Sequence, residues 1–296
     1  MYNSKFKNSF APAMAAVFTQ KFPLKNELEK FRKKGKKIGF VPTMGALHQG
    51  HFSLLEKSKR DNDITVCSIF VNPTQFNNSK DYINYPRNPE ADVKALQRYQ
   101  IDLIFLPSSE EMYSVAEETL DFDAGKIAEI MEGKFRPGHF AGVASIVHKF
   151  LEIVNPDRAY FGQKDFQQYL LIRKLAKERN PNVEIVACPT TRNEAGLALS
   201  SRNQLLTREQ QDAATAIYRT LTKAGEMVMA GRAIQEVKAW ALQNLALDEL
   251  LKPEYFEIVN AETLNDIKSK SEAEKILIAA AVRAGEIRLL DNIVLE

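Results

Sequence analysis

Apolar positions in the first 190 residues fall into two alternating patterns. Short continuous runs such as Ile64–Val71 are typical of strands that helices cover on both faces. Between these runs, apolar residues recur with a helical period, as Leu24, Leu28 and Phe31 do on one face. Repeated strand–helix units of this kind predict an α/β, Rossmann-like fold built on a doubly wound parallel sheet.

The same patterns give the expected elements. Helices are predicted over 24–34, 51–61, 89–99, 139–154 and 166–179, and strands over 38–41, 64–71, 102–106, 158–161 and 183–187. Three boundaries also carry cap signals. These are Gly35 after the first helix, Asn88 and Pro89 at the start of the third, and Asn155 and Pro156 after the fourth.

The alternation of predicted strands and helices ends after Pro189. Residues 191–202 lack periodicity and are interpreted as a loop. Helices are then predicted over 208–229 and 234–245, and strands over 255–259, 275–282 and 287–290. This succession predicts a second, smaller α+β domain. We therefore expect two domains, residues 1–188 and residues 189–296.

Composition narrows the possible partners. Forty basic and 38 acidic side chains leave a net charge of +2, so no overall field favours nucleic acid or an acidic membrane. The longest apolar run, Ile276–Val282, is too short to span a bilayer. Cys67 and Cys188 lie far apart in apolar runs, which indicates reduced core cysteines and a cytoplasmic protein.

The first twenty residues contain lysines but no acidic residue, and their apolar stretch is short and broken. We interpret residues 1–20 as an extra tail rather than a targeting peptide. Initiation at Met14 is an alternative that removes most of this tail.

The segment from Val41 to His51 carries the strongest functional signal. His48 and His51 stand three residues apart around Gly50, directly after an apolar strand and at the predicted start of a helix. Unpaired N–H groups and the positive end of the helix dipole attract anions there, and histidines add hydrogen bonds to phosphate oxygens. The segment therefore predicts handling of a nucleotide triphosphate.

Three further polar segments follow predicted strands. They are residues 72–75, 162–165 and 191–202. Parallel strands end at one edge of the sheet, where α/β proteins bind ligands. These segments and the histidine pair therefore predict a single site.

Side chains in these segments suit particular tasks. Lys164 suits the β- and γ-phosphates or a developing negative charge, and Arg202 with its neighbours Ser200 and Ser201 suits phosphate oxygens. Asp165 either holds a magnesium ion or caps the next helix, and the sequence leaves both roles open.

Four other polar residues carry weaker signals. Gln75 and Gln168 are neutral amides that fix a small hydroxy acid without requiring it to be charged. His139 stands at a predicted helix start, where an anion-binding role and a structural role are equally supported. His148 lies within an apolar helical pattern and is interpreted as structural.

Five segments together resemble the pantothenate synthetase (pantoate–β-alanine ligase) family: 42–51, 70–76, 136–139, 162–168 and 196–203. The two histidines alone indicate only the wider nucleotidyltransferase superfamily, but five segments in the same order are specific. The resemblance covers roughly Leu24 to the C-terminus. It implies that ATP and pantoate form pantoyl adenylate with release of pyrophosphate, and that β-alanine then displaces AMP to give pantothenate.

The resemblance also implies a set of site residues. His51 matches the family's proton donor, and His48, Lys164 and Arg202 complete the catalytic set. ATP would be bound by Met44, Gly45, Ala46, Leu47, His48, Gln49, Gly50, His51, Gly162, Gln163, Lys164, Asp165, Thr191, Leu199, Ser200, Ser201 and Arg202. Gln75, Gln168 and Asn72 match pantoate-binding positions, and Gln75 also lies near the β-alanine site. Thr191 replaces the usual valine, which matters little if its backbone contacts adenine.

Family members use ATP with Mg²⁺ and are typically cytoplasmic homodimers. The resemblance implies the same here, with the first domain binding nucleotide and pantoate and the second closing as a lid that keeps water from the adenylate. Two other interpretations remain: a nucleotidyltransferase with a nucleotide-alcohol or dinucleotide product, and a catalytically silent nucleotide sensor. The paired glutamines and the Ser-Ser-Arg segment disfavour the first, and the complete set of charged and histidine side chains disfavours the second.

Overall fold

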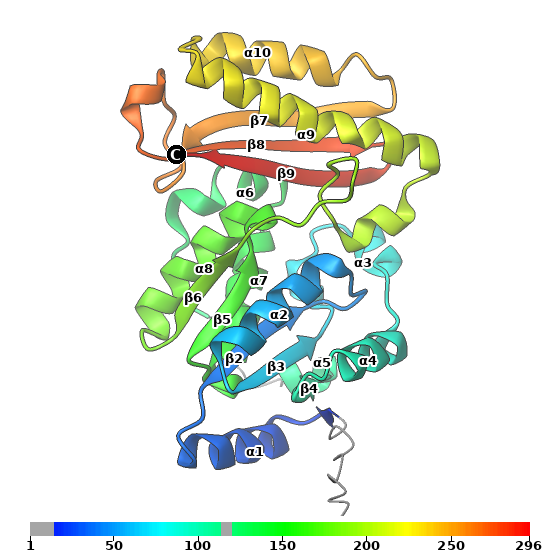
Figure 1. Cartoon of the computed structure of the whole chain (residues 1–296), viewed down its shortest axis with the longest axis vertical. Coiled ribbons are helices and arrows are strands. Elements are labelled where there is room, and N and C mark those ends of the chain that lie inside the picture. The colour runs from blue at the N-terminus through cyan, green and yellow to red at the C-terminus, as the bar shows by residue number, and fades with distance from the viewer. Residues whose placement is uncertain (1–14, 114–119) are drawn as a thin grey trace, which may run out of the picture.

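The computed structural model describes residues 15–113 and 120–296, which form two sheets (Figure 1). The larger sheet has six strands, all parallel, in the order β1-β4-β3-β2-β5-β6. They are β1 (Ala16–Phe18), β2 (Ile38–Thr43), β3 (Ile64–Ile69), β4 (Leu103–Phe105), β5 (Arg158–Gly162) and β6 (Glu184–Cys188). The parallel order confirms the predicted doubly wound sheet.

Helices cover both faces of this sheet, as the apolar runs require. On one face lie α1 (Lys21–Lys33), α7 (His139–Val154) and α8 (Phe166–Arg179), and on the other α2 (Gln49–Asp61) and α4 (Pro89–Arg98). Leu28, Val147 and Leu171 fill the first layer. Leu55 and Leu96 fill the second. Each layer removes an apolar face from water, which is the main driving force for folding.

The second sheet is a three-stranded antiparallel meander of β7 (Leu251–Asn260), β8 (Ile276–Ala284) and β9 (Ile287–Leu295). Helices α9 (Arg208–Met229) and α10 (Ile234–Leu245) cover one face. The other face lies toward the helices of the larger sheet (Figure 1). Tyr255 and Leu277 on this face pack against Phe166 and Leu170 of α8. This arrangement confirms the predicted smaller α+β unit.

Several short elements have no counterpart in the sequence-based prediction. They are α3 (Ser79–Asn84), α5 (Ser109–Met112), α6 (Glu132–Phe135) and the 3-10 turns η1 (Pro73–Gln75), η2 (Gly125–Ala128), η3 (Gln163–Asp165), η4 (Ser201–Leu205) and η5 (Lys270–Glu272). One or two turns are too short to show a hydrophobic period. Local caps hold some of them instead, as Asn72 does for η1 and Asn78 for α3.

The prediction of a tail over residues 1–20 is wrong from Ala15 onward. Ala15 is buried, Ala16–Phe18 pairs in parallel with β4, and α1 begins at Lys21. A three-residue edge strand carries no period of its own, so only its partner reveals it. Residues 1–14, including the alternative start at Met14, lie outside the described residues.

The cap signals are confirmed, and so is the prediction that both cysteines are reduced core residues. The Asn88 side chain accepts a hydrogen bond from the Ala91 N–H at the start of α4, and Asn155 ends α7 with a positive φ of 42°. Cys67 and Cys188 are buried and free. Within residues 15–113 and 120–296, no helix is both long and apolar enough to cross a membrane.

Candidate active site

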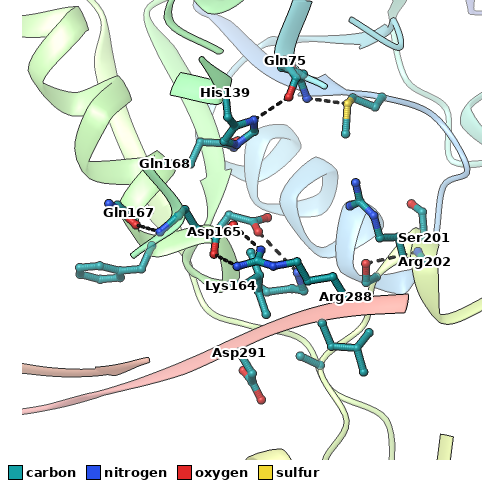
Figure 2. Close-up of a pocket in the computed structure, with 18 of the residues that line it drawn as sticks. Gln75, His139, Lys164, Asp165, Gln167, Gln168, Ser201, Arg202, Arg288 and Asp291 are labelled. Atoms are coloured by element: carbon teal, nitrogen blue, oxygen red, sulfur yellow. Dashed lines mark hydrogen bonds and ion pairs between the residues drawn. The ribbon is translucent and has the colours of Figure 1, made fainter. Parts of the chain in front are cut away.

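The strand order places a crevice at the carboxyl ends of β2 and β5. The chain runs from β2 outward to β3 and β4 on one side, whereas β5 lies on the other side of β2. Such a reversal of direction leaves an opening where doubly wound folds bind ligands. A cavity of about 730 Å³ opens here between the two sheets (Figure 2). Its volume is suited to a nucleotide with a small second substrate.

The turn after β2 is held from below by a buried carboxylate. Asp92 of α4 accepts hydrogen bonds from the N–H groups of Ala46 (2.9 Å) and Leu47 (2.8 Å). Gly45 has φ 77°, and a Cβ there would lie 2.8 Å from the Asp92 carboxylate. A side chain would therefore both strain this turn and displace its anchor.

His48 and His51 close the start of α2 with their own side chains. His48 Nδ1 accepts from the Gly50 N–H (3.1 Å), and His51 Nδ1 accepts from the His48 N–H (3.3 Å). Their ring centroids lie 4.1 Å apart. A Cβ at Gly50 would lie 2.9 Å from the His48 ring, which explains the glycine between the histidines.

This geometry corrects the expectation that open backbone N–H groups make the anion site at α2. The amides of Ala46, Leu47, His48 and Gly50 already have side-chain acceptors. Sequence reasoning did not consider that the histidines themselves would accept those hydrogen bonds. What the histidine pair offers a ligand is therefore its ring edges, since both residues line the cavity.

Both rings are neutral at physiological pH. Burial, followed by the charge of Lys164, lowers the pKa of His48 to about 4. Burial and the neighbouring His48 lower the pKa of His51 to about 3. Because Nδ1 of each ring accepts a hydrogen bond, its proton must lie on Nε2. The pair therefore presents two neutral N–H donors.

The turn after β5 contributes charge. The Lys164 side chain is 18% exposed and its Nζ lies 3.5 Å from Asp165 Oδ1. Asp165 stands at the start of α8 but makes no side-chain cap bond, so the capping role is not realised. Burial disfavours its ionised form, but Lys164 and then Arg202 outweigh this and hold the pKa of Asp165 below its usual range.

The smaller sheet fixes this second turn. Asn292 of β9 donates to the backbone carbonyls of Gln163 (2.9 Å) and Lys164 (2.7 Å). One amide group thus holds the segment in place from across the cavity. Figure 2 shows Lys164 and Asp165 beside β9.

The segment from Thr191 to Arg202 folds back over the histidine turn. Leu199 N–H donates to the Thr191 carbonyl (2.9 Å), and the Thr191 hydroxyl lies 3.1 Å from that of Ser53 on α2. The buried Ser201 hydroxyl donates to the Ala46 carbonyl (3.1 Å). Two of the polar segments predicted to share one site are thereby in direct contact.

Arg202 has a partner that the sequence did not suggest. Its Nε and Nη2 donate to the carboxylate of Asp81 on α3, at 3.1 and 2.8 Å. Its guanidinium also lies 5.3 Å from the centre of the Tyr85 ring. Asp81 and Tyr85 both line the cavity, so α3 belongs to the site although it was not predicted.

The predicted acid-binding amides lie on another part of the wall. Gln75 Nε2 contacts Met44 Sδ at 2.7 Å, and its Oε1 accepts from Asn72 at 3.3 Å. The Asn72 side chain is hydrogen-bonded to other protein groups, because its Nδ2 also donates to the Gly142 carbonyl and its Oδ1 accepts from Tyr113. Gln168 lines the cavity from α8.

His139 and Arg136 complete this wall. His139 Nδ1 donates to the Gln75 carbonyl at 2.8 Å, and its Nε2 accepts from Arg136 at 3.0 Å. Burial and then Arg136 lower the pKa of His139 to about 4, so this ring is also neutral. His148 lies outside the cavity wall and contacts Asn180 Oδ1 at 3.2 Å, which fits its structural interpretation.

Fifteen of the predicted site residues line the cavity: Met44, His48, Gly50, His51, Asn72, Gln75, Gly162, Lys164, Asp165, Gln168, Thr191, Leu199, Ser200, Ser201 and Arg202. Five do not: Gly45, Ala46, Leu47, Gln49 and Gln163. Gly45, Ala46 and Leu47 shape the turn over Asp92, whereas Gln49 is exposed.

Comparison with known proteins agrees with this geometry. The family described as pantoate-beta-alanine ligase matches residues 16–294. The pantothenate synthetase of Caldicellulosiruptor bescii is 49% identical over 282 residues, which cover 95% of this chain and 99% of that protein.

Two solved structures are similar across nearly the whole chain. Pantothenate synthetase from Thermus thermophilus has a TM-score of 0.88 at 38% identity, covering 94% of this chain and 98% of its own. Pantoate-beta-alanine ligase from Francisella tularensis, solved in complex with beta-gamma ATP and beta-alanine, has a TM-score of 0.78 at 35% identity, covering 95% and 97%.

The match from β1 to β9, together with the two histidines, the lysine and the paired glutamines around one cavity, leads to a single conclusion. The chain belongs to the pantoate-beta-alanine ligase family.

Proposed function

We propose that the cavity between the two sheets catalyses the ATP-dependent condensation of pantoate with β-alanine, giving pantothenate, AMP and pyrophosphate through an enzyme-bound pantoyl adenylate. Family membership supports the reaction. The observation that carries it within this chain is the division of one cavity into two chemically different walls. His48, His51, Lys164 and Arg202 line one wall, and the amides Gln75 and Gln168, with Arg136 and His139 beside them, line the other.

In the first step a carboxylate oxygen of pantoate attacks the α-phosphorus of ATP, and pyrophosphate leaves. Negative charge builds on the phosphoryl oxygens and on the leaving group, so preorganised donors lower the barrier. We assign this role to the Nε2–H groups of His48 and His51 and to the cations Lys164 and Arg202. No protein nucleophile is required, because pantoate itself attacks.

Arg202 has to be shared between Asp81 and the triphosphate. Asp81 holds the guanidinium at the cavity wall through two hydrogen bonds, which leaves the remaining N–H groups for a phosphate oxygen. The side chain is thereby oriented before ATP arrives. Ser200, Ser201 and Leu199 continue the same wall toward Thr191, where we place the adenine.

In the second step the amine of β-alanine attacks the acyl carbon of the adenylate, and AMP leaves. Gln75 and Gln168 suit the hydroxyl groups of pantoate, because an amide both donates and accepts. Asn72 acts on pantoate through Gln75, since it donates to Gln75 Oε1 at 3.3 Å.

Magnesium fits the site as part of the nucleotide complex. In residues 15–113 and 120–296 no group of three His, Cys, Asp or Glu side chains forms a cage for a metal ion. Mg²⁺ is commonly held by substrate phosphates, waters and one carboxylate, and Asp165 is the carboxylate we assign to it. The ion would neutralise the charge of the triphosphate.

Three wider properties belong to the same proposal. We place the domain boundary at residues 188 and 189, with residues 189–296 closing over the adenylate to exclude water. Contacts such as those from Asn292 to Gln163 and Lys164 would transmit that closure to the site. We also propose a homodimer, as is typical of the family, and a cytoplasmic location, which suits the two free buried cysteines.

Pyrophosphate release from the purified chain with MgATP tests the reaction. We expect release with pantoate alone, and pantothenate plus AMP, identified by mass, once β-alanine is added. No pantoate-dependent release would favour a different nucleotidyltransferase. ATP binding without any turnover would favour a nucleotide sensor.

A further inference from the structure

The two acids of the proposed reaction differ in the fate of their carboxylates. The carboxylate of pantoate is consumed when it becomes the mixed anhydride. The carboxylate of β-alanine takes no part in bond making and stays ionised from binding to product. A carboxylate brought into a cavity loses its hydration, and a fixed cation must replace it. The neutral Gln75 and Gln168 do not provide one.

Among residues 15–113 and 120–296, six cationic side chains line the cavity: Lys80, Arg136, Lys164, Arg202, Arg283 and Arg288. Three of them are unsuited to the β-alanine carboxylate. Lys164 and Arg202 face the triphosphate, and each already has a carboxylate within 3.5 Å. Lys80 is exposed to solvent.

The arginines of β8 and β9 are neutralised by acids of their own. Arg283 and Arg288 both donate to Glu254, each at 2.6 Å. Arg288 also donates to both oxygens of the buried Glu132 at 2.6 Å. Two carboxylates therefore balance these two guanidiniums.

Arg136 adds a third positive charge to this group without a carboxylate of its own. Within the described residues its ion-pair partner is Glu132, at 3.6 Å, and both oxygens of Glu132 already bind Arg288. The side chain of Arg136 is only 15% exposed and lines the cavity. The cluster consequently has one unbalanced positive charge, at Arg136.

Neighbouring groups hold Arg136 in a defined position. It donates to His139 Nε2 at 3.0 Å and to the Gln75 carbonyl at 3.4 Å. His139 in turn donates to the same carbonyl at 2.8 Å. The guanidinium has five donors, so N–H groups remain for a carboxylate after these contacts are made. It lies beside Gln75, on the wall to which the proposed function assigns the acid substrates.

We infer that Arg136 binds the carboxylate of β-alanine and thereby selects an amino acid over a simple amine in the second step. This inference rests on the proposed function. His139 acts as a positioning residue, because it orients Arg136 and ties it to Gln75.

The test compares two amine substrates in wild type and in Arg136→Gln. β-Alanine and β-alaninamide have the same amine and spacing, but the amide lacks the carboxylate. In wild type we expect kcat/KM for β-alanine to exceed that for β-alaninamide by about 10- to 100-fold, the range for a charge-assisted hydrogen bond. In Arg136→Gln the ratio should fall close to one, through a higher KM for β-alanine. A general packing defect would slow both amines alike and leave the ratio unchanged.

Two controls separate the possible outcomes. Pantoate-dependent exchange of pyrophosphate into ATP reports the first step, so its persistence in Arg136→Gln shows a folded enzyme with a working adenylation site. Arg283→Gln removes the same charge from the same cavity at a position neutralised by Glu254 and should keep the wild-type ratio.

Three results would overturn the inference. They are an unchanged ratio in Arg136→Gln, an equal fall of the ratio in Arg283→Gln, or a higher KM for pantoate in the exchange reaction. The last result would show that Arg136 binds the carboxylate of pantoate. Absence of exchange in wild type would instead overturn the proposed function itself, so the two failures are distinguishable.

Discussion

The β2–α2 and β5–α8 junctions both follow strands whose carboxyl ends border the cavity, but they are built in opposite ways. At the β2–α2 junction, the side chains of His48 and His51 accept hydrogen bonds from backbone N–H groups at the start of the helix. At the β5–α8 junction, Asp165 makes no side-chain cap bond, and the turn is held by Asn292 from the other sheet.

The difference shows how one edge of a sheet provides two kinds of anion recognition. Capping uses Nδ1 of each histidine and leaves a neutral, directed Nε2–H donor on a rigid helix end. The other junction supplies a full charge from Lys164, while the start of α8 lacks a side-chain cap. The β2–α2 junction thus supplies directional hydrogen bonds, and the β5–α8 junction supplies charge.

The largest effect is expected from removing the directed donor. His51→Ala should slow pantoate-dependent pyrophosphate release by about 10²- to 10⁴-fold, because a positioned donor acts in the transition state. It also removes the acceptor for the His48 N–H, which costs about 1 kcal/mol of stability. Single-turnover kinetics and thermal unfolding, measured on the same sample, separate the two effects.

His148→Ala is the matched control for this variant. His148 lies on α7 away from the cavity wall and contacts Asn180. Its removal should leave pyrophosphate release near the wild-type rate. Near-normal release by His51→Ala would show that the histidine acts only as a helix cap, and the contrast between the junctions would lose its functional meaning.

A somewhat smaller loss is expected at the charged junction. Lys164→Ala should slow adenylate formation by about 10²- to 10³-fold, because it removes a charge that stabilises the phosphoryl oxygens and the leaving pyrophosphate. Lys177→Ala, which changes an exposed lysine on α8 outside the cavity wall, should have no effect. A defect confined to the transfer of the pantoyl group to β-alanine, with normal pyrophosphate release, would contradict the placement of Lys164.

The contrast between the junctions also marks what the sequence could and could not predict. The long elements were predictable, since α7, α8, α9 and α10 begin and end at the expected residues. Their apolar periods extend over three or more turns, and Asn155 ends α7 in a left-handed conformation. The common location of the polar segments was predictable as well, because parallel strands end at the same edge of the sheet.

The features that were not predicted depend on a partner distant in sequence. In the sequence Asp92 is simply an acid in the first turn of α4, and only the folded chain brings it under Ala46. Asp81 and Arg202 are 121 positions apart, and α3 is too short to show a period. The double use of each histidine, as cap and as donor, was hidden because a motif records residue types and not the direction of each nitrogen.

The buried anchor beneath the first junction gives a third prediction. Asp92→Asn replaces one acceptor by an N–H group that faces a backbone N–H, so one of the hydrogen bonds to Ala46 and Leu47 is lost. We expect a loss of about 1–3 kcal/mol in the free energy of unfolding. Glu90→Gln, at an exposed position on the same helix, serves as the control. Unchanged urea unfolding in Asp92→Asn would show that the turn holds itself.

The smallest effect over the physiological range concerns the charge state of the three histidines that line the cavity, two of which belong to the first junction. In the folded chain the pKa values of His48 and His139 are lowered to about 4 and that of His51 to about 3, in each case chiefly by burial. In the unfolded chain each has a pKa of about 6.5. Between these values the unfolded chain binds protons that the folded chain does not. The stability that these neutral histidines contribute is therefore fully present above a pH of about 6.5 and is lost as the pH decreases toward the folded pKa values.

Urea unfolding between about pH 7.5 and about pH 5 measures this dependence. Near a pH of about 5.5, the slope of the free energy of unfolding against pH should correspond to the uptake, on unfolding, of about two to three protons by the three histidines. His48→Asn keeps a good cap acceptor but cannot titrate, so it should reduce that uptake by about one proton. An unchanged slope in His48→Asn would mean that His48 is already charged when folded. Both junctions would then present cations, and the distinction between a neutral and a charged end of the site would no longer hold.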